Sequence, residues 1–508
     1  MTRVIRIAST KKNVVFNLAG RGYVALMSFV FVPLYLSLLG AEAYGLIGLY
    51  ASLQVVVSLL DMGLSPTLTR ELARLSASPD NAQEARDLVR TLELVYWIIG
   101  VVIGSSLFLL APWIAFHAVH AQNLPASTLT LVVRIASLIL VFQWPDSFYS
   151  GGLMGLQQQS TLNYIRMAMA TLQGVGALMV LRFWSCTIQA YFSWLVVVWA
   201  VQTLLLVYYL WKNLIPTDQQ PQFRSQLWGK NARFTAGMTG IMLTAIVLTQ
   251  LDKMILVSYL PLAQFGYYML AFNIANSLNF IVAPIYTAVF PRYTQMATSN
   301  DAEGLKQFYH QSCQLLSAIL VPLSVTGVLF SKELLQAYLH NAQTVAHAQP
   351  LFCLLLIGTA CNCLVTLPYG LQLAYGWTQL SINKNVIAVL LFVPSMLLMV
   401  KYFGAIGAAV MWIAVNAGYI VLEIPFMHHR LLRGEAAAWY LQDIGLPLCI
   451  SLGIGFLARM ILPAGMPPLF AVVWSAFTCG LAITGIVLCL PWMRAMLYRV
   501  LPTKQNRI

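Results

Sequence analysis

The chain has 508 residues, of which 59% are hydrophobic and only 9% are charged. Because a soluble globular protein carries about 25% charged residues, this composition excludes an ordinary soluble enzyme. The formal net charge of +13 at pH 7 would indicate a nucleic-acid partner in a soluble protein, but in a chain this apolar the basic residues must first be placed relative to a membrane.

Predicted transmembrane segments follow one another along the whole chain. Each is an apolar run close to the length of about 20 residues that crosses a bilayer as a helix, and charged, Pro-containing or Gly-containing breaks separate the runs. The sequence therefore predicts an all-α polytopic membrane protein with about 14 transmembrane helices. In chain order the predicted spans are 14–38, 43–65, 91–115, 128–150, 162–181, 188–211, 234–258, 265–290, 308–330, 347–370, 385–401, 405–427, 442–463 and 469–490.

The basic residues gather on one side of these predicted spans. With the N-terminus in the cytoplasm, 22 of the 29 Lys and Arg fall in cytoplasmic segments. Because cytoplasmic connections carry an excess of Lys and Arg, we expect both termini in the cytoplasm and an even number of spans. The positive charge therefore concerns orientation in the membrane, and no nucleic-acid partner is expected.

Weak internal repetition divides the chain into two lobes. Tyr44–Leu46 at the start of the second span corresponds to Phe265–Tyr267 at the start of the eighth, at an offset of about 220 residues. Repeats of this kind place a substrate site between the lobes, near the middle of the membrane. We expect an N-terminal lobe (1–211, spans 1–6), a cytoplasmic linker (212–233), a C-terminal lobe (234–430, spans 7–12) in parallel repeat, and two additional helices with a cytoplasmic tail (431–508).

Polar side chains form stripes on the first two spans. At 100° per residue, Asn17 and Arg21 share an arc of about 40° on the first span. On the second span an arc of about 80° holds Tyr50, Gln54, Ser58, Asp61 and Ser65. A charge at the centre of a bilayer costs at least about 2.5 kcal/mol unless it faces protein or water, so we expect these stripes to line a cavity. Asp61 and Asp146 also lie near the inner surface, where either can be an interfacial residue instead.

The first two spans of the second half carry similar residues. Asp252 and Lys253 are adjacent in the seventh span, and Asn273 and Asn276 recur at three-residue spacing in the eighth. Neighbours on a helix point about 100° apart, so we do not expect Asp252 and Lys253 to pair well with each other. Neutralisation of charges on other helices is the alternative to a functional role for these two residues. Polar residues of this kind also join helices by hydrogen bonds, which is the alternative interpretation of both stripes.

Motifs of soluble enzymes are absent from the sequence. The eight Cys include no CxxC pair and no zinc spacing, His117 and His120 lack a third ligand, and no Walker or Rossmann pattern occurs among the 32 Gly. A membrane-embedded polymerase or acyltransferase would need a convergent catalytic set, which the sequence does not offer. We therefore predict no catalytic residue, no metal site and no cofactor, and we do not expect an enzyme.

The motifs at the start of the second span resemble a known family. Leu38–Leu46, Leu60–Ser65 and Arg70–Glu71 resemble the opening of the polysaccharide (O-antigen, Wzx-type) flippases of the multidrug/oligosaccharidyl-lipid/polysaccharide (MOP) exporter superfamily, and Phe265–Tyr268 and Gly404–Ala409 agree with it. The resemblance implies a flippase of the bacterial inner membrane that moves undecaprenyl-pyrophosphate-linked oligosaccharide repeat units by alternating access. It also implies ion coupling and a role in the biosynthesis of surface polysaccharide and lipopolysaccharide.

The resemblance also implies roles for the polar stripes. Arg21 suits the diphosphate, because a guanidinium binds phosphate oxygens in pairs, and Asp61 or Asp252 can carry a proton or Na⁺. Arg21 and Lys253 favour an anionic substrate over a cationic one, but a multidrug or cation antiporter and a lipid II flippase of the same superfamily stay open as alternatives. The implied partners are the lipid-linked oligosaccharide, membrane lipids, a polysaccharide polymerase and a chain-length regulator, with the chain acting as a monomer.

Overall fold

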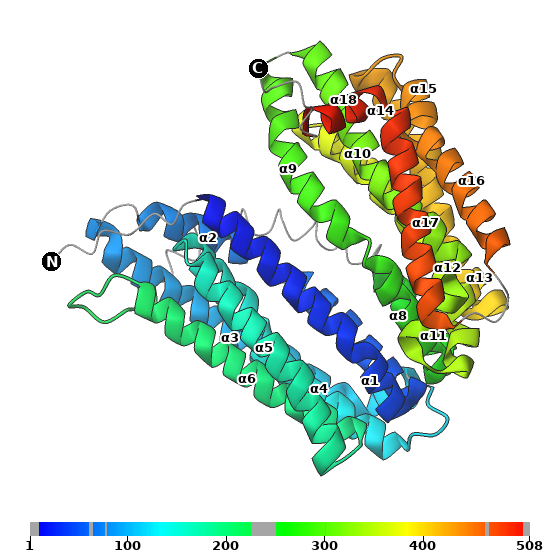
Figure 1. Cartoon of the computed structure of the whole chain (residues 1–508). Coiled ribbons are helices and arrows are strands. Elements are labelled where there is room, and N and C mark those ends of the chain that lie inside the picture. The colour runs from blue at the N-terminus through cyan, green and yellow to red at the C-terminus, as the bar shows by residue number, and fades with distance from the viewer. Residues whose placement is uncertain are drawn as a thin grey trace, which may run out of the picture. The chain divides into compact units, whose positions relative to one another are not determined.

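The computed structural model describes residues 10–59, 64–76, 79–118, 120–224, 250–299, 301–462 and 467–500. These residues form long helices with short connections, and they contain no β-strand (Figure 1). The chain divides into two compact units, which are described separately: unit 1 (Met1–Gly266) and unit 2 (Tyr267–Ile508).

Unit 1 is a bundle of long helices, several of which pack most closely against helices that are not their neighbours in sequence (Figure 1). Residues 250–259 are also helical, and α8 (Leu262–Asn276) begins in unit 1 and ends in unit 2. The other helices of this unit are α1 (Thr10–Leu59), α2 (Leu64–Leu75), η1 (Pro79–Asn81), α3 (Ala82–Trp113), η2 (Ile114–Ala118), α4 (Ala126–Gly155), α5 (Gln159–Met179), η3 (Val180–Trp184) and α6 (Ile188–Asn213).

Unit 2 is also a helical bundle, and it includes the last two predicted spans. Its helices after α8 are α9 (Asn279–Thr298), α10 (Ala302–Leu329), α11 (Ser331–Leu339), α12 (Ala342–Ala374), α13 (Thr378–Gly418), η4 (Tyr419–Glu423), α14 (Ile424–Leu431), α15 (Ala436–Ala438), η5 (Trp439–Gly445), α16 (Leu446–Ile461), α17 (Pro468–Cys489) and α18 (Pro491–Val500). The η2, η3, η4 and η5 segments are π-helical turns that continue or join α-helices.

The described helices confirm the all-α polytopic fold. Eleven segments of the described chain are long and apolar enough to cross a membrane. Two of them, in α1 and α13, turn at Gly40 (φ 81°) and Gly404 (φ 58°), where a side chain would be strained and one helix gives way to the next. Division at these two glycines gives thirteen spans, and the remaining predicted span, 234–258, is described only from residue 250 onward.

Small residues let the helices of unit 1 approach closely. A Cβ added to Gly155 of α4 would lie 2.7 Å from the carbonyl oxygen of Thr69, and one added to Gly100 of α3 would lie 3.1 Å from the Trp144 ring. Close packing at such residues drives helix association in membranes, where burial of apolar surface contributes little. The outer surfaces of the helices carry large apolar side chains, as a bilayer requires, and Leu109 and Phe183 are 78% and 84% exposed.

The beginning of the predicted linker is attached to α3. Asp87 is fully buried, and its carboxylate accepts a hydrogen bond from the backbone N–H of Gln222 (2.8 Å) and pairs with the Arg224 guanidinium (2.8 Å). The backbone N–H of Arg224 also donates to the Thr91 hydroxyl (2.9 Å). Residues 217–224 therefore lie on unit 1, and residues 225–233 of the predicted linker lie outside the described residues.

We expect Asp87→Ala to detach this segment. Loss of the buried carboxylate removes about 1 kcal/mol of docking free energy, so trypsin should cleave after Arg224 roughly fivefold faster in the folded protein. The matched control is Asp80→Ala, because Asp80 is an exposed acidic residue at the start of the same helical region. Equal cleavage rates in the two variants would contradict the anchoring role of Asp87.

Candidate functional site

The predicted site residues of α1 are only partly described. Asn17 and Arg21 lie in α1, but their side chains are not among those described, and Asp61 lies outside the described residues. Gln54 is half-buried, and its amide donates to the Tyr50 hydroxyl (2.6 Å) and to Oε1 of Gln143 on α4 (3.0 Å). The stripe that contains Gln54 therefore contacts α4 through side-chain hydrogen bonds, as the helix-joining alternative predicts.

A second polar group in unit 1 surrounds Asp146 of α4. Its Oδ1 accepts a hydrogen bond from Gln202 of α6 (2.6 Å), and its Oδ2 lies 3.5 Å from Nη2 of Arg166 of α5. Arg166 also donates to the Ser150 hydroxyl (3.0 Å). Asp146 is therefore held by side chains of two other helices. Gln143, Asp146 and Ser150 recur on one face of α4. This helical spacing is the feature of the sequence from which the polar group could have been predicted.

Asp252 and Lys253 pair with each other, so the expectation that they would not was wrong. The Lys253 ammonium lies 3.0 Å and 3.1 Å from the two carboxylate oxygens of Asp252, and both residues are buried. The Cβ atoms of neighbouring residues do point apart on a helix, but the long flexible stem of lysine folds back far enough to close the ion pair. Mutual neutralisation lowers the free-energy cost of burying both charges.

We expect the two residues to be energetically coupled. Asp252→Asn should destabilise the protein, because it removes the carboxylate that lies 3.0 Å from the buried Lys253 ammonium. Adding Lys253→Met removes that charge, so the double variant should unfold at a higher temperature than Asp252→Asn alone. Thermal unfolding of the purified variants measures this, and strictly additive losses of stability would contradict the pairing.

Asn276 lies at a break in the predicted eighth span. The α-helix stops after Asn276 and resumes at Asn279, so the continuous span predicted over 265–290 is interrupted. The side chain of Asn279 donates to the backbone oxygen (3.3 Å) and to the side-chain oxygen (2.9 Å) of Asn276, and Ser277 donates to the Ile274 carbonyl (2.7 Å). The Asn279 side chain thereby satisfies the Asn276 carbonyl, while the Ile274 carbonyl also accepts the backbone N–H of Ser277 (3.2 Å). Asn273, one turn before the break, is exposed, as is Asn276.

Amide side chains that sequence reasoning missed join α12 to α13 in the same unit. Asn362 donates to Oδ1 of Asn416 (2.8 Å), and the Trp412 indole donates to the Thr359 hydroxyl (3.2 Å). Cys363, the neighbour of Asn362, has its sulfur 3.8 Å from Oδ1 of Asn279. Irregular backbone at membrane depth is stable where it is buried in protein or lines a water-filled cavity, so the break at Asn276 is the candidate polar site of unit 2.

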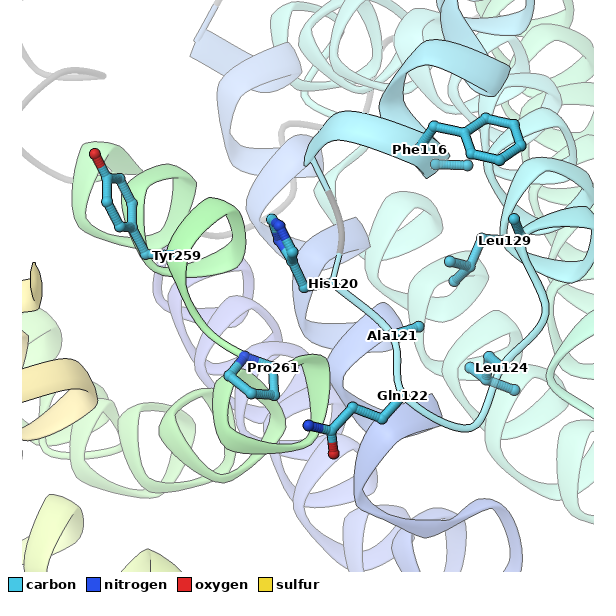
Figure 2. Close-up of a pocket in the computed structure, with 10 residues that line it drawn as sticks. Phe116, His120, Ala121, Gln122, Leu124, Leu129, Tyr259 and Pro261 are labelled. Carbon is cyan, nitrogen blue, oxygen red and sulfur yellow. The ribbon is translucent and has the colours of Figure 1, made fainter.

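A cavity of about 550 Å³ opens at one end of unit 1 (Figure 2). It lies where the connection after η2 passes residues 259–261, and Pro261 lies beside the backbone that carries His120 (Figure 2). The Leu262 N–H donates to the His120 carbonyl (2.8 Å), and Glu42 accepts a hydrogen bond from the Gln122 N–H (2.6 Å). The predicted site residues whose side chains are described do not line this cavity. Its lining residues are Ala115, Phe116, His120, Ala121, Gln122, Leu124, Ala126, Leu129, Tyr259 and Pro261.

Two protein families match the chain. Residues 10–297 match the family described as "Polysaccharide biosynthesis protein". Residues 239–398 match the family described as "MatE". The first match covers more than half of the chain, and the second covers part of its C-terminal half.

Two curated relatives align with most of the chain. A protein of Shigella flexneri named as a candidate O-antigen transporter is 21% identical over 402 residues, which are 79% of this chain and 93% of that protein. The lipopolysaccharide biosynthesis protein WzxC of Escherichia coli (strain K12) is 25% identical over 410 residues, which are 78% of each chain.

Solved structures share the fold. The lipid II flippase MurJ in an inward closed conformation superposes with a TM-score of 0.71 over 96% of this chain and 99% of that one, at 10% identity. A multidrug resistance MATE family transporter of the MOP superfamily, in its inward-facing conformation, gives a TM-score of 0.64 over 82% of this chain and 94% of that one, at 14% identity. At these identities the likeness concerns the fold alone.

Proposed function

Because the chain belongs to the polysaccharide biosynthesis protein family, we propose that it is a flippase for undecaprenyl-pyrophosphate-linked oligosaccharide repeat units. It moves them across the bacterial inner membrane by alternating access for the synthesis of surface polysaccharide. The observation that carries this proposal is the family match over residues 10–297. The names of the two relatives, an O-antigen transporter and a lipopolysaccharide biosynthesis protein, support it.

The chemistry of the helices suits an amphiphilic substrate. Asp146 and Arg166 lie among the helices of unit 1, and the amides around Asn276 lie within unit 2, while the outer surfaces of the helices are apolar. A lipid-linked sugar needs polar side chains for its sugar and diphosphate, and it needs hydrocarbon contact for its tail. Both kinds of surface occur in each unit.

The residues of the polar stripes are the proposed binding groups. Arg21 binds the diphosphate, Asp61 and Asp252 are the ion-coupling residues, and the other proposed substrate contacts are Asn17, Gln54, Lys253, Asn273 and Asn276. The ion pair between Asp252 and Lys253 supports this role, because binding of a proton or Na⁺ at Asp252 would release the Lys253 ammonium toward an anion.

The proposed organisation follows the sequence. The lobes 1–211 and 234–430 form a parallel repeat and are joined by the linker 212–233. Residues 431–508 add two helices and a tail. Both termini face the cytoplasm. The chain acts as a monomer next to a polysaccharide polymerase and a chain-length regulator. Reporter fusions at the two termini test the orientation, and a periplasmic signal from either terminus would contradict it.

Complementation tests the function in cells. A strain without its own O-antigen transporter should regain surface polysaccharide when this chain is expressed, provided that the repeat unit is one the chain accepts. A strain depleted of its lipid II flippase, and a strain sensitive to cationic drugs, provide the two alternative outcomes. Rescue of either of these strains without any surface polysaccharide in the first would contradict the proposal.

A further inference from the structure

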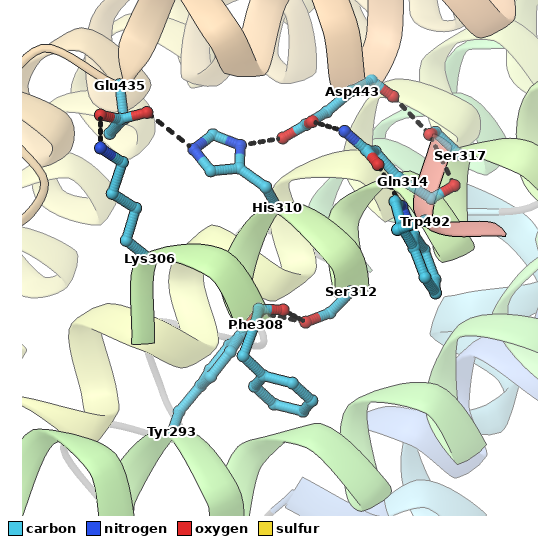
Figure 3. A network of polar contacts seen from close by, with 10 residues as sticks. All are labelled: Tyr293, Lys306, Phe308, His310, Ser312, Gln314, Ser317, Glu435, Asp443 and Trp492. Carbon is cyan, nitrogen blue, oxygen red and sulfur yellow. Dashed lines mark hydrogen bonds and ion pairs between the residues drawn. The ribbon is translucent and has the colours of Figure 1, made fainter. Parts of the chain in front are cut away.

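A chain of polar side chains in unit 2 runs from an exposed lysine to a fully buried carboxylate (Figure 3). Helix α10 supplies Lys306, His310 and Gln314, which are four residues apart and therefore share one face of the helix. Glu435, just before α15, and Asp443, within η5, face them. The exposed fraction of the side chain falls from 41% at Lys306 to 18% at Glu435, 15% at His310 and 0% at Asp443.

The contacts along this chain are short and unbroken. The Lys306 ammonium lies 2.7 Å from Oε1 of Glu435, and Oε2 of Glu435 lies 3.1 Å from Nε2 of His310. On the other edge of the imidazole, Nδ1 lies 2.6 Å from Oδ2 of Asp443. The Gln314 amide donates to the second oxygen of Asp443 (2.8 Å). Every polar atom of the imidazole and of the buried carboxylate therefore has a partner.

The buried end is fixed by two further contacts. The Trp492 indole N–H of α18 donates to the Gln314 carbonyl oxygen, and the Ser317 hydroxyl donates to the backbone carbonyl of Asp443. Asp443 itself lies in a seven-residue π-helical segment, Trp439–Gly445. Such segments are rare in α-helices and are frequent at functional sites.

The geometry around His310 requires a proton beyond those of a neutral imidazole. A neutral imidazole has one N–H, but both ring nitrogens of His310 face carboxylate oxygens, which only accept hydrogen bonds when ionised. The second contact therefore needs a second proton, either on the ring or on a carboxyl group. The charge count agrees: with a neutral imidazole, Lys306, Glu435 and Asp443 sum to −1 around a buried carboxylate, and one added proton brings the sum to zero.

The surroundings supply few other charges. The Lys306 hydrogen bond lowers the pKa of the Glu435 carboxyl, so Glu435 is ionised at neutral pH. Glu303 lies one turn before Lys306 on α10, and the guanidinium of Arg292 on α9 lies 5.0 Å from the centre of the Phe308 ring.

Several further titratable groups face this region from α9, α10 and α14. His428 of α14 contacts the Tyr309 ring, and its Nδ1 lies 2.8 Å from the Ile424 carbonyl oxygen. The others are Tyr293, Tyr309 and Cys313, and tyrosine and cysteine side chains are ordinarily neutral at pH 7. The proton that the geometry requires is therefore held by His310 and its two carboxylates.

We propose that His310, Asp443 and Glu435 form a proton-binding site that holds one proton and is loaded from its exposed end. A proton from a hydronium ion binds the Glu435 carboxylate and passes to Nε2 of His310, while the proton on Nδ1 stays in its hydrogen bond to Oδ2 of Asp443, so that the ring carries both protons. No bond between heavy atoms changes, and one positive charge moves inward. The ligand is a proton and not a metal ion, because the two carboxylates contact opposite edges of the imidazole and do not converge on one point.

Infrared spectroscopy of the full chain in lipid nanodiscs tests the site directly. The difference spectrum between about pH 5 and about pH 9 should contain carboxyl and imidazole bands that correspond to one proton. Asp443→Asn and His310→Gln should each remove these bands. The matched control is Glu423→Gln, because Glu423 is a buried carboxylate of unit 2 that contacts Gln372 and lies outside this network. An unchanged difference spectrum in Asp443→Asn would overturn the proposal.

A second measurement needs no variant of a buried residue. Nitrogen NMR of ¹⁵N-histidine-labelled wild-type chain should show one ring with both nitrogens protonated, and Glu435→Gln, a change at the more exposed end, should alter that signal alone. A set of histidine signals unaffected by Glu435→Gln would contradict the relay. Neither readout involves transport, so this inference and the proposed function fail or succeed separately.

Discussion

Arg21→Ala is expected to abolish surface polysaccharide while the protein stays in the membrane at its normal amount. Arg21 lies on the polar stripe of the first span, where a guanidinium can bind two oxygens of a diphosphate at once. Charge-assisted bonds of this kind contribute about 1.5–3 kcal/mol each, so the loss of two corresponds to at least a hundredfold reduction in substrate affinity. Gel analysis of surface glycan, together with immunoblots of the membrane fraction, measures both quantities.

Two further variants separate the effect of paired phosphate binding by Arg21 from the effect of a positive charge alone. Arg21→Lys keeps the charge but loses the paired geometry, and we expect it to restore only part of the glycan. Arg182→Ala removes an exposed arginine within η3 and should leave glycan display unchanged. Normal display in Arg21→Ala would refute the assigned role of this residue.

Gly45→Ala and Gly266→Ala are expected to destabilise unit 1. These are the two glycines that the internal repeat aligns, and they meet in the structure: an added Cβ at Gly45 would overlap the Leu262 carbonyl oxygen, and one at Gly266 would overlap the Ala41 carbonyl oxygen. Both obstacles are backbone atoms, so the helices must move apart, which costs about 1–3 kcal/mol for each substitution. Thermal unfolding in detergent measures the loss.

The control for these variants is Gly480→Ala. Gly480 lies within α17, and an added Cβ there would meet no atom within 4 Å. Alanine favours the helix by about 0.8–1.0 kcal/mol over glycine, so this substitution should leave the unfolding temperature unchanged or raise it. A similar loss of stability in all three variants would show that close packing at Gly45 and Gly266 is not the cause.

The helices were predictable from the sequence because they depend on local properties. An apolar run of about 20 residues determines a span whatever it packs against. The breaks in α1 and α13 coincide with Gly40 and Gly404, which lie between predicted spans. The interruption after Asn276 was not predictable in the same way, because no Pro or Gly marks it and the stabilising bonds come from asparagine and serine side chains.

The candidate sites were only partly predictable. Stripes on single helices identified Gln54 and Asn276, but a stripe does not reveal which side chain of another helix it meets. Asp146 accepts a hydrogen bond from Gln202, which lies 56 residues further along the chain. His310 contacts Asp443 across 133 residues of sequence. One sequence carries no signal for such pairs. The ion pair of Asp252 and Lys253 was missed although both residues lie on one helix. The Cβ directions of neighbouring residues predict no contact, but the lysine side chain is long enough to reach the carboxylate.

Reconstitution of the purified chain tests the flippase function most directly. Liposomes carry an undecaprenyl-pyrophosphate-linked oligosaccharide in both leaflets, and an external glycosidase first removes the sugars of the outer leaflet. With the chain present, the protected inner pool should become sensitive to the enzyme, and with Arg21→Ala or without protein it should stay protected. An inner pool that stays protected with the wild-type chain, in liposomes where the same chain moves lipid II or a cationic dye, would contradict the account.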